Sequence, residues 1–344
     1  METTPCGGGV RVRLHGSALG FACAPGQTLL AAGLAAGLDL PYECASGSCG
    51  SCRARLLQGR VHSRWHAAPG LSERDRAKGD RVLCCQSEAV EDCVLQLRAG
   101  TDPVPVLPER RSACVTLRRR LNKDVLHLAL CTDGERAAEF RPGQFMLFQG
   151  PGDIGRRAYS MANLPGAGPR LEFLIKRKPG GAASDWLFDG LRTGDSVELE
   201  GPYGKAWLRD DTVDSELLLL AGGSGLAPVW SIAQASLAAL PQRRVRLYFG
   251  VQSAQDLFWI EEMQRLAAAV PTFELVIALA RPSAADPPGC HVGQVGDVLA
   301  ADLPPQSEQS LYMAGPPGLI DHVSALLVRT GRLRAERVFY DRYA

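Results

Sequence analysis

The chain has 344 residues, which is longer than one typical domain and fits two or three. Its hydrophobic and charged fractions are ordinary for a globular protein, and a formal net charge of +1 gives no reason to expect a nucleic-acid or membrane-surface partner. The longest apolar run is too short to cross a membrane, and the N-terminus has no apolar leader core. We therefore expect a cytoplasmic protein, in which eleven cysteines favour metal binding over disulfides.

Residues 8–98 are predicted to form a small α+β domain. Strand-like segments occur on both sides of a cysteine-rich loop, at 9–14, 21–24, 52–61, 80–87 and 92–99. The pattern predicts one helix, in the Ala- and Leu-rich stretch that follows the Pro-Gly turn at 25–26. Residues 99–110 hold three prolines and few core residues, so we expect a linker there.

Two further domains are expected after the linker. Residues 111–212 contain six short strands of even spacing with Gly and Pro turns, which predict an antiparallel β-barrel with one helix near 182–191. Residues 213–344 alternate buried strands with helices, which predicts an α/β domain with a parallel sheet. In that last domain the strands are expected at 216–221, 244–250, 273–280 and 310–315, and helices at 227–240 and 257–270.

The strongest chemical signal is the loop CASGSCGSC. Cys44, Cys49 and Cys52 have the C-x4-C-x2-C spacing of a plant-type [2Fe–2S] site, which needs one more distant cysteine. Cys84 and Cys85 are both candidates on spacing alone.

The residues between these cysteines also suit a cluster. Gly and Ser let backbone N–H groups turn towards the sulfurs of a negatively charged cluster. Two alternatives remain: a zinc site, although a second C-x2-4-C unit is missing, and plain unligated thiols.

Three further motifs point to phosphate-bearing cofactors. The stretch RAYSMAN begins at Arg157, and downstream GGAAS, residues 180–184, precedes the expected helix. Free N–H groups at such a start suit a pyrophosphate, although a glycine turn capped by Ser184 is the plain structural alternative. GGSGLAP, starting at Gly222, joins a buried strand to a helix, which is dinucleotide-site architecture without the G-x-G-x-x-G fingerprint.

Taken in order, these motifs resemble a known family over nearly the whole chain, from about Val10 to Tyr343. The cysteine loop followed by Val-Leu-Cys-Cys-Gln, residues 82–86, is similar to the ferredoxin module of bacterial oxygenase reductases. RAYS, GGAAS, GGSGLAP and the later AGPPG resemble the ferredoxin–NADP reductase superfamily. The resemblance implies a β-grasp-like ferredoxin domain, a flavin barrel and a nicotinamide domain, with Cys85 as the fourth ligand and Cys84 as a buried neighbour.

The resemblance also implies which residues hold FAD. Arg157 is expected to contact the pyrophosphate, Tyr159 to lie against the flavin ring, and Ser160 to hydrogen-bond near its reactive nitrogen. Ala158 belongs to the same strand, and Lys176 is a further phosphate candidate, although solvated surface charge explains a lysine there equally well. The expected phosphate loop is Gly181, Ala182, Ala183 and Ser184.

For the nicotinamide coenzyme, the implied residues are Gly222, Gly223, Gly225, Gly315, Pro316 and an aromatic cover at Tyr343. This sequence departs from the family pattern in having Ala314 where cysteine is frequent, Gln252 where arginine is frequent and Tyr343 where phenylalanine is more usual. The stretch after residue 251 lacks the cations that a 2′-phosphate needs, which favours NADH, while Arg281 keeps NADPH open.

These modules together predict an electron path from NADH through FAD to a [2Fe–2S] cluster and then to a terminal oxygenase or an intermediate ferredoxin. Such a relay needs no nucleophile or strong general base, and we assign none. Two alternatives remain: the same path serving a sugar-deoxygenation enzyme, and a zinc-binding interaction protein on a degenerate reductase scaffold.

Overall fold

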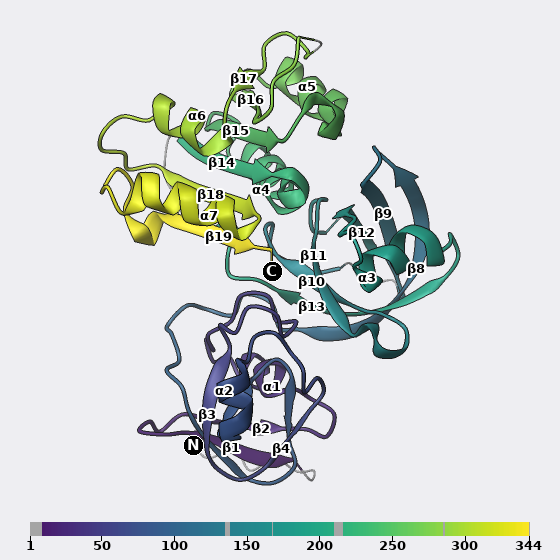
Figure 1. Ribbon diagram of the computed structural model, residues 1–344, viewed down its shortest axis with the longest axis vertical. Coiled ribbons are helices and arrows are strands. Elements are labelled where there is room, and N and C mark those ends of the chain that lie inside the picture. Colours follow the sequence, from purple (N-terminus) through teal and green to yellow (C-terminus); the bar gives the residue numbers. More distant parts are fainter. Residues whose placement is uncertain (1–8, 135–137, 167, 210–215, 285, 344) are drawn as a thin grey trace. The chain divides into compact units, whose positions relative to one another are not determined.

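The computed structural model describes residues 9–343 except 135–137, 167, 210–215 and 285. The described residues form two compact units, 9–109 with 201–203 and 110–200 with 204–343 (Figure 1). None of the helices in these described residues is long and apolar enough to cross a membrane.

The first unit is a mixed five-stranded sheet with a buried helix. The strand order is β2-β1-β7-β3-β5; β1 and β7 run parallel, and the other neighbours run antiparallel. A separate two-stranded ribbon pairs β4 with β6. The elements are β1 (Val10–Leu14), β2 (Gly20–Cys23), α1 (Leu29–Ala35), β3 (Arg53–Gln58), β4 (Val61–Ser63), α2 (Glu73–Lys78), β5 (Arg81–Leu83), β6 (Ser87–Ala89) and β7 (Cys93–Gln96).

The expected helix is α1, and its sequence explains both its start and its burial. The Thr28 hydroxyl accepts a hydrogen bond from the backbone N–H of Ala31 at 3.2 Å, which caps the first turn. Residues 29–34 are all buried, as an Ala- and Leu-rich helix without charges requires.

A second helix, α2, corrects the expectation of one helix in this part of the chain. None of its six residues is buried, so it has no apolar stripe that periodicity could reveal. Its signals are caps instead: the Ser72 hydroxyl accepts from the Asp75 N–H at 3.1 Å, and Gly79 ends the helix with φ +70°.

The residues after β7 are tied to the first unit by Asp39, which is 9% exposed. Its carboxylate accepts a hydrogen bond from the backbone N–H of Asp102 at 3.0 Å, and its carbonyl accepts from that of Gly100 at 2.7 Å. A Cβ at residue 100 would lie 2.0 Å from the Asp39 carboxylate, so glycine permits this approach. The first residues of the predicted linker are therefore held against this unit.

The second unit begins with a six-stranded antiparallel barrel, as expected. The strand order is β11-β10-β13-β8-β9-β12, and a bridge between Met161 and Phe173 brings the two edge strands together. The expected helix is a short α3 that continues into a wider turn at 186–190. The elements are β8 (Glu109–Arg120), β9 (Val125–Thr132), β10 (Phe145–Gln149), β11 (Arg156–Ser160), β12 (Arg170–Lys176), α3 (Ala182–Asp185) and β13 (Ser196–Tyr203).

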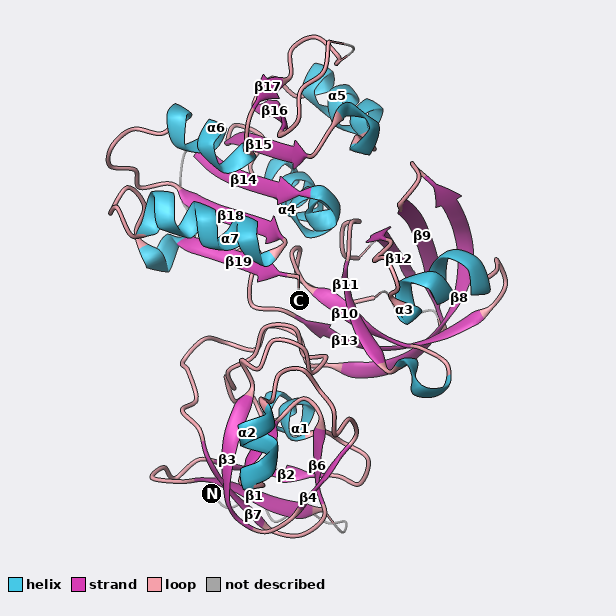
Figure 2. Cartoon of the chain, in the orientation of Figure 1, coloured by secondary structure: helices cyan, strands magenta, loops and turns pink. Residues whose placement is uncertain are grey.

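A six-stranded parallel sheet follows, in the order β17-β16-β15-β14-β18-β19. Helices α4 and α5 pack on one face, and α6 and α7 pack on the other (Figure 2). The four expected strands and two expected helices are confirmed. The elements are β14 (Glu216–Gly222), α4 (Leu226–Ala239), β15 (Arg244–Val251), α5 (Ile260–Ala269), β16 (Phe273–Leu279), β17 (His291–Val292), α6 (Val295–Asp302), β18 (Ser310–Gly315), α7 (Pro317–Val323) and β19 (Val338–Arg342).

The barrel and the parallel sheet share one buried core. Val125, Ala162 and Leu174 of the barrel belong to the same apolar cluster as Leu217 of β14 and Trp230 of α4. Ser231 of α4 also donates a hydrogen bond to the carbonyl of Asn163 at 2.7 Å. The two halves of this unit are therefore joined by packing as well as by the chain.

Candidate functional site

The cysteine-rich loop lies between α1 and β3, and its three sulfurs and that of Cys85, which follows β5, approach one another in two pairs. Cys52 and Cys85 are buried, with their sulfurs 3.2 Å apart. Cys44 and Cys49 form the other pair: their thiols are hydrogen-bonded, and the Cys49 backbone N–H donates to the Cys44 sulfur at 3.4 Å. All four predicted ligands are therefore brought to one loop region.

Each pair already favours one thiolate. The hydrogen bond with Cys49 lowers the pKa of Cys44 to about 4, and the same bond raises the pKa of Cys49. The hydrogen bond with Cys85 likewise lowers the pKa of Cys52, while that bond and burial raise the pKa of Cys85. Thiolates are the form in which cysteine binds iron, so the pairs are chemically suited to ligation.

The two adjacent candidates for the fourth ligand differ in their surroundings. Cys85 is the residue whose sulfur contacts Cys52, and the side-chain amide of Gln86 lies 3.8 Å from that same sulfur. Cys84 is 1% exposed, and its backbone is used by the fold: its N–H bonds the Cys52 carbonyl and its carbonyl accepts from Leu30. Cys84 therefore occupies a packing position.

A binuclear cluster fits this donor set. In the described part of the chain, no three His, Cys, Asp or Glu side chains gather tightly enough to hold a single metal ion. The two thiol pairs together provide four sulfurs, the number that a [2Fe–2S] cluster would take from the protein. Backbone N–H groups also point at the sulfurs, since Ser51 donates to Cys49 at 3.5 Å.

The loop depends on a close backbone contact. Gly50 has φ +81°, and a Cβ there would lie 2.7 Å from the carbonyl oxygen of Gly70. The backbone N–H of Gly70 in turn donates to the Gly47 carbonyl at 2.9 Å. Residues 65–71 thus pack directly on the cysteine loop.

We predict that Gly50→Ala lowers stability and cluster content more than Gly79→Ala does. Both glycines have positive φ, so each alanine costs about 1–2 kcal/mol in backbone strain, but a Cβ at residue 79 meets nothing within 4 Å. The contact with Gly70 adds roughly 1–3 kcal/mol at residue 50 and displaces the loop. Thermal unfolding and iron per protein measure the difference. Equal losses in the two variants would contradict the role of the contact.

Strand β11 presents the motif predicted to hold a flavin. Tyr159 lies edge-on to Phe148 with ring centroids 5.0 Å apart, and burial raises the pKa of Tyr159. Arg157 is half-buried, and its guanidinium donates to the neighbouring Arg156 carbonyl at 2.7 Å. Ala158 faces the opposite side of the strand from these two, as alternation requires.

The GGAAS loop has the form of a closed turn. The Ser184 hydroxyl donates to the Gly181 carbonyl at 2.9 Å and accepts from the Lys178 N–H at 3.0 Å, so it holds the loop together. It does not cap the helix, because Ser184 lies inside α3 and the N-cap Gly181 has no side-chain cap, so the structural alternative of a turn capped by Ser184 is wrong in that detail. The small residues Gly181, Ala182 and Ala183 still leave the backbone open to close approach, which a phosphate needs.

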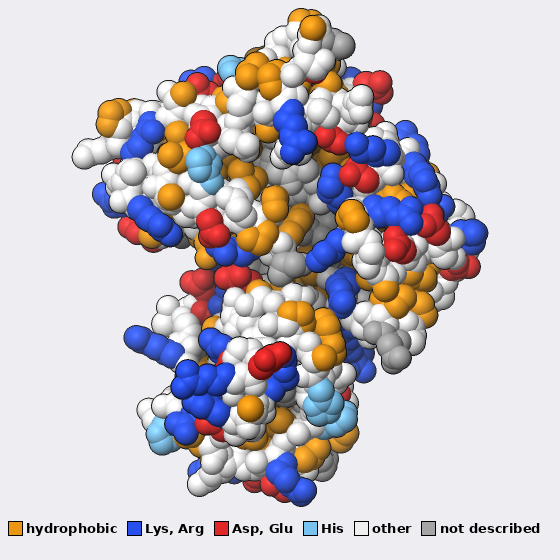
Figure 3. All heavy atoms as spheres, in the orientation of Figure 1, with side chains coloured by type: hydrophobic (Ala, Val, Ile, Leu, Met, Phe, Trp, Pro, Cys, Tyr) orange, Lys and Arg blue, Asp and Glu red, His pale blue; other side chains and the backbone are white. Residues whose placement is uncertain are grey.

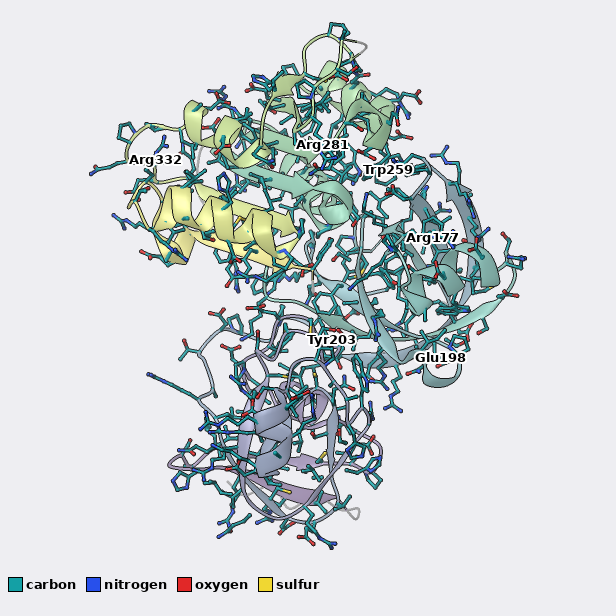
Figure 4. The ribbon with its side chains drawn as sticks, in the orientation of Figure 1. Arg177, Glu198, Tyr203, Trp259, Arg281 and Arg332 are labelled. Atoms are coloured by element: carbon teal, nitrogen blue, oxygen red, sulfur yellow. The ribbon has the colours of Figure 1, made fainter. Side chains whose placement is uncertain are left out.

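The two cations before this loop differ in their surroundings. Arg177 pairs with Asp185 at 2.8 Å and packs over the Phe188 ring, so it belongs to the local structure around α3 (Figure 4). Lys176 pairs with Asp124 at 2.9 Å, and its side chain lies 4.0 Å from the Cβ position of Gly223. Lys176 therefore lies beside the glycine-rich turn of the parallel sheet.

The two glycine motifs of the parallel sheet lie side by side. Strands β14 and β18 are neighbours, with Ala221 opposite Ala314. A Cβ on Gly225 would lie 2.0 Å from the Ala314 carbonyl oxygen, so the turn after β14 packs directly on the backbone before Gly315. Gly222 and Gly223 complete that turn, and Pro316 begins α7 beside it.

The end of the chain reaches both motifs and the flavin strand. The Tyr343 N–H donates to the Gly315 carbonyl at 3.0 Å, and its hydroxyl donates to the Ser224 carbonyl at 3.3 Å. Ser160, 6% exposed, donates to the Asp341 carboxylate at 2.9 Å and also bonds Tyr343. Burial raises the pKa of Tyr343. Predicted residues from all three motifs thus meet in one place.

Sequence reasoning missed Asp341. In the segment YDRYA the sequence analysis singled out only the aromatic Tyr343. In the structure β19 pairs with β18, and this pairing places Asp341 opposite Ala314. The available signal was a carboxylate at the carboxyl end of a parallel strand, the edge where such sheets bind ligands.

This donor set fits FAD and a nicotinamide coenzyme. Tyr159 offers a half-buried aromatic ring for a flat cofactor, Arg157 a cation for phosphate and Ser160 a hydroxyl already oriented by Asp341. The glycine turn after β14 offers backbone without side chains for a second dinucleotide.

Comparison with known proteins agrees with this geometry. Residues 12–90 match the 2Fe-2S iron-sulfur cluster binding domain, residues 112–207 the oxidoreductase FAD-binding domain and residues 219–325 the oxidoreductase NAD-binding domain.

Whole proteins of similar length also match. The chain is 46% identical to the ferredoxin–NAD(+) reductase component of the alkene monooxygenase system of Xanthobacter autotrophicus, over 94% of this chain and 97% of that protein. It is 37% identical to the ferredoxin–NAD(P)(+) reductase CarAd of Metapseudomonas resinovorans, over 97% and 99%. The solved ferredoxin reductase of carbazole 1,9a-dioxygenase superposes with a TM-score of 0.85 at 34% identity, covering 98% of this chain and 99% of that one.

The cluster-binding, FAD-binding and NAD-binding domains, together with relatives that match over nearly their full length, show that the chain belongs to the family of ferredoxin–NAD(P)+ reductases that serve as electron-transfer components of oxygenase systems.

Proposed function

We propose that the protein takes electrons from NADH and delivers them singly to an oxygenase component, or to a separate ferredoxin that serves one. FAD supplies the conversion from a two-electron hydride donor to one-electron transfer, and the [2Fe–2S] cluster supplies the outgoing single-electron carrier. The observation that carries this proposal is the meeting of Ser160, Tyr343 and the glycine-rich turn, because hydride transfer needs the flavin and nicotinamide sites to adjoin.

For the flavin, we assign positioning roles to β11 and the loop before α3. Arg157 binds the pyrophosphate, Tyr159 packs against the ring, and Ser160 places its hydroxyl at the reactive edge. Gly181 to Ser184 form the wall for the phosphates, where the Ser184 hydroxyl holds the loop shape.

Asp341 is assigned as a positioning residue for Ser160. A hydroxyl has one proton and two lone pairs, and here its proton goes to the Asp341 carboxylate. The oxygen lone pairs are then directed elsewhere and can accept a hydrogen bond from a protonated ring nitrogen.

For the cluster, we assign four ligands: Cys44, Cys49, Cys52 and Cys85.

For the nicotinamide coenzyme, we assign the glycine-rich turn and the residues beside it: Gly222, Gly223, Gly225, Gly315, Pro316 and Tyr343. The backbone of the glycine turn admits the pyrophosphate, while Tyr343 covers the place where the nicotinamide enters. Lys176 lies between the two dinucleotide sites and neutralises phosphate charge.

The proposal is tested by an anaerobic visible spectrum of the purified protein before and after NADH is added. Overlapping flavin and iron–sulfur absorption that bleaches rapidly is the expected result. Flavin bleaching alone, with zinc in place of iron, would contradict the cluster. A colourless protein would exclude the electron path and support the zinc-scaffold alternative.

The preference for NADH is supported by the groups after β15, where the second strand of a dinucleotide fold meets the ribose. The Ser253 hydroxyl and N–H both donate to the Asp256 carboxylate, at 2.8 Å and 3.1 Å. These donors are thus occupied by a carboxylate that also pairs with Lys123 at 3.4 Å, so what favours NADH is that Gln252 and Ser253 themselves stand where a 2′-phosphate would need cations. The exposed Arg281 is near, since its N–H bonds the Gln252 carbonyl at 2.8 Å (Figure 4).

We predict that Gln252→Arg raises kcat/KM for NADPH by roughly tenfold, since one charge-assisted hydrogen bond contributes about 1.5–3 kcal/mol. Steady-state kinetics with ferricyanide as acceptor, run with both coenzymes, measure the change. Gln252→Met is the matched control and should leave NADPH use unchanged. If the wild type already uses NADPH as well as NADH, the proposed preference is wrong.

The acceptor is proposed from the relatives. The protein with 46% identity serves an alkene monooxygenase system, so an oxygenase component of that kind is the first acceptor to assay. The alternative acceptor, a sugar-deoxygenation enzyme, would receive electrons through the same sequence of NADH, FAD and [2Fe–2S] cluster. We also propose that the protein works in the reducing cytoplasm, where cluster-binding thiols stay free of disulfides.

A further inference from the structure

Positive charge is concentrated around the cluster loop. Residues 9–98 contain eleven Lys and Arg against eight Asp and Glu, a net of +3, whereas the whole chain has only +1. Within that range, residues 53–81 hold eight Lys and Arg against three Asp and Glu. Figure 3 shows Lys and Arg side chains gathered over β3 and α2.

This charge lies next to the cysteine loop through a short chain of contacts. Residues 65–71 pack on Gly47 and Gly50, and the Trp65 ring would touch a Cβ at residue 47 at 3.2 Å. The Arg76 guanidinium of α2 donates to the Leu71 carbonyl at 2.6 Å, which holds that segment against the helix. Helix α2 therefore borders the segment that covers the cluster loop.

Some of these cations are neutralised within the unit and some are not. Arg53 pairs with Asp75 at 2.9 Å and Arg55 with Asp80 at 2.7 Å. Arg74 and Lys78 are exposed, and neither has an ion-pair partner among the residues that the structure describes. Within residues 53–81, Arg74 and Lys78 thus leave unpaired positive charge on α2, as the exposed Arg11 and Arg13 do on β1 among the described residues.

An apolar strip lies between this helix and the cluster loop. Trp65 is half-buried, while Ala67 and Pro69 are exposed. Interfaces of this kind combine an apolar centre that excludes water with a charged rim that steers the partner. The Arg76 guanidinium is taken up by the carbonyls of Ala68 and Leu71, so we call Trp65, Pro69, Arg74 and Lys78 the docking face.

We propose that the docking face is where the electron acceptor binds, and that the acceptor is a protein with an acidic surface around its own redox centre. This inference rests on the proposed function. Trp65 and Pro69 bring the partner next to the cluster loop, and Arg74 and Lys78 attract it. Because rim charges act mainly on association, the acceptor's reduction is salt-sensitive.

The test uses the full-length holoprotein and two variants with the same charge change. Arg74→Glu with Lys78→Glu alters the docking face. Arg11→Glu with Arg13→Glu, on exposed positions of β1, is the matched control. Cytochrome b5, acidic around its heme, and cytochrome c, basic around its heme, are the probes. Rates are compared between about 20 mM and about 300 mM salt.

For the wild type we expect the rate of cytochrome b5 reduction to fall about tenfold between low and high salt. At low salt the docking-face variant should reduce cytochrome b5 about tenfold more slowly than the wild type, and it should reduce cytochrome c faster. The control variant should change less than about threefold. NADH-driven bleaching of the cluster should stay the same in all three proteins.

Two results would overturn the inference. Equal effects of the two double variants would show that only net charge matters. Slower cluster bleaching in the docking-face variant would show that this face serves the protein's own flavin. A wild-type cluster that NADH does not bleach at all would instead contradict the proposed function itself, and ferricyanide reduction would show whether the flavin half still works.

Discussion

Replacing Cys85 with serine is expected to abolish the [2Fe–2S] cluster while FAD remains bound. Cys85 is 4% exposed and its sulfur lies 3.2 Å from that of Cys52, so a serine leaves one iron with a hard, protonated oxygen in a buried position. Mutation of a group that only supports a metal ligand typically lowers metal affinity or activity 10–100-fold. Loss of a ligand itself should cost more, so we expect the rate at which a protein acceptor is reduced to fall at least about 100-fold. Reduction of ferricyanide by NADH should change less than about twofold, because it needs only the flavin.

Cys84→Ser is the matched control for this experiment. It changes the adjacent residue, which is equally buried but whose backbone, rather than its sulfur, is used by the fold. We expect normal iron content and a modest loss of stability of about 1–3 kcal/mol from a buried hydroxyl. Iron and sulfide analysis and the electron paramagnetic resonance spectrum of the reduced protein decide the matter. A Cys85→Ser protein with a normal spectrum would show that the fourth ligand is Cys84.

Replacing Ser160 with alanine is expected to slow reduction of the flavin by NADH about 100-fold with little change in FAD content. The hydroxyl is held by Asp341 at 2.9 Å beside Tyr343, so it is a prearranged polar group where we propose that the reacting edge of the flavin lies. Removal of one such group costs about 10²–10³ in rate in comparable sites. Anaerobic stopped-flow mixing with NADH measures the step directly.

Asp341→Asn separates orientation from charge at the same position. An amide oxygen still accepts the Ser160 hydrogen bond, so we expect about a tenfold effect, smaller than that of Ser160→Ala. Asp341→Ala should approach the Ser160→Ala rate. A different result would contradict this role. If the Ser160→Ala protein contains less FAD, but the FAD that it retains is reduced by NADH as fast as in the wild type, the residue holds the cofactor and takes no part in hydride transfer.

The architecture was predictable because its signals are local. The barrel strands and the buried strands of the parallel sheet are short apolar runs bounded by Gly and Pro, and each lies where those runs predict. Helix α2 escaped because none of its six residues is buried, which leaves only its caps as a signal. The terminal strand β19 has no apolar alternation and is defined by its pairing with β18.

The candidate site was predictable where one short motif carries the chemistry. The C-x4-C-x2-C spacing singled out three thiols directly. Spacing alone left Cys84 and Cys85 open and the resemblance favoured Cys85, and the 3.2 Å contact between Cys85 and Cys52, which only the fold creates, supports that prediction. Asp341 was missed for the same reason, since its partner Ser160 is 181 residues away along the chain.

The core shared by the barrel and the parallel sheet has a thermodynamic consequence. Because Val125, Ala162 and Leu174 are buried with Leu217 and Trp230 in one cluster, melting either half exposes apolar surface of the other. Residues 110–200 and 204–343 should therefore give a single calorimetric transition. Bound FAD then raises the melting temperature of the nicotinamide half as much as that of the barrel.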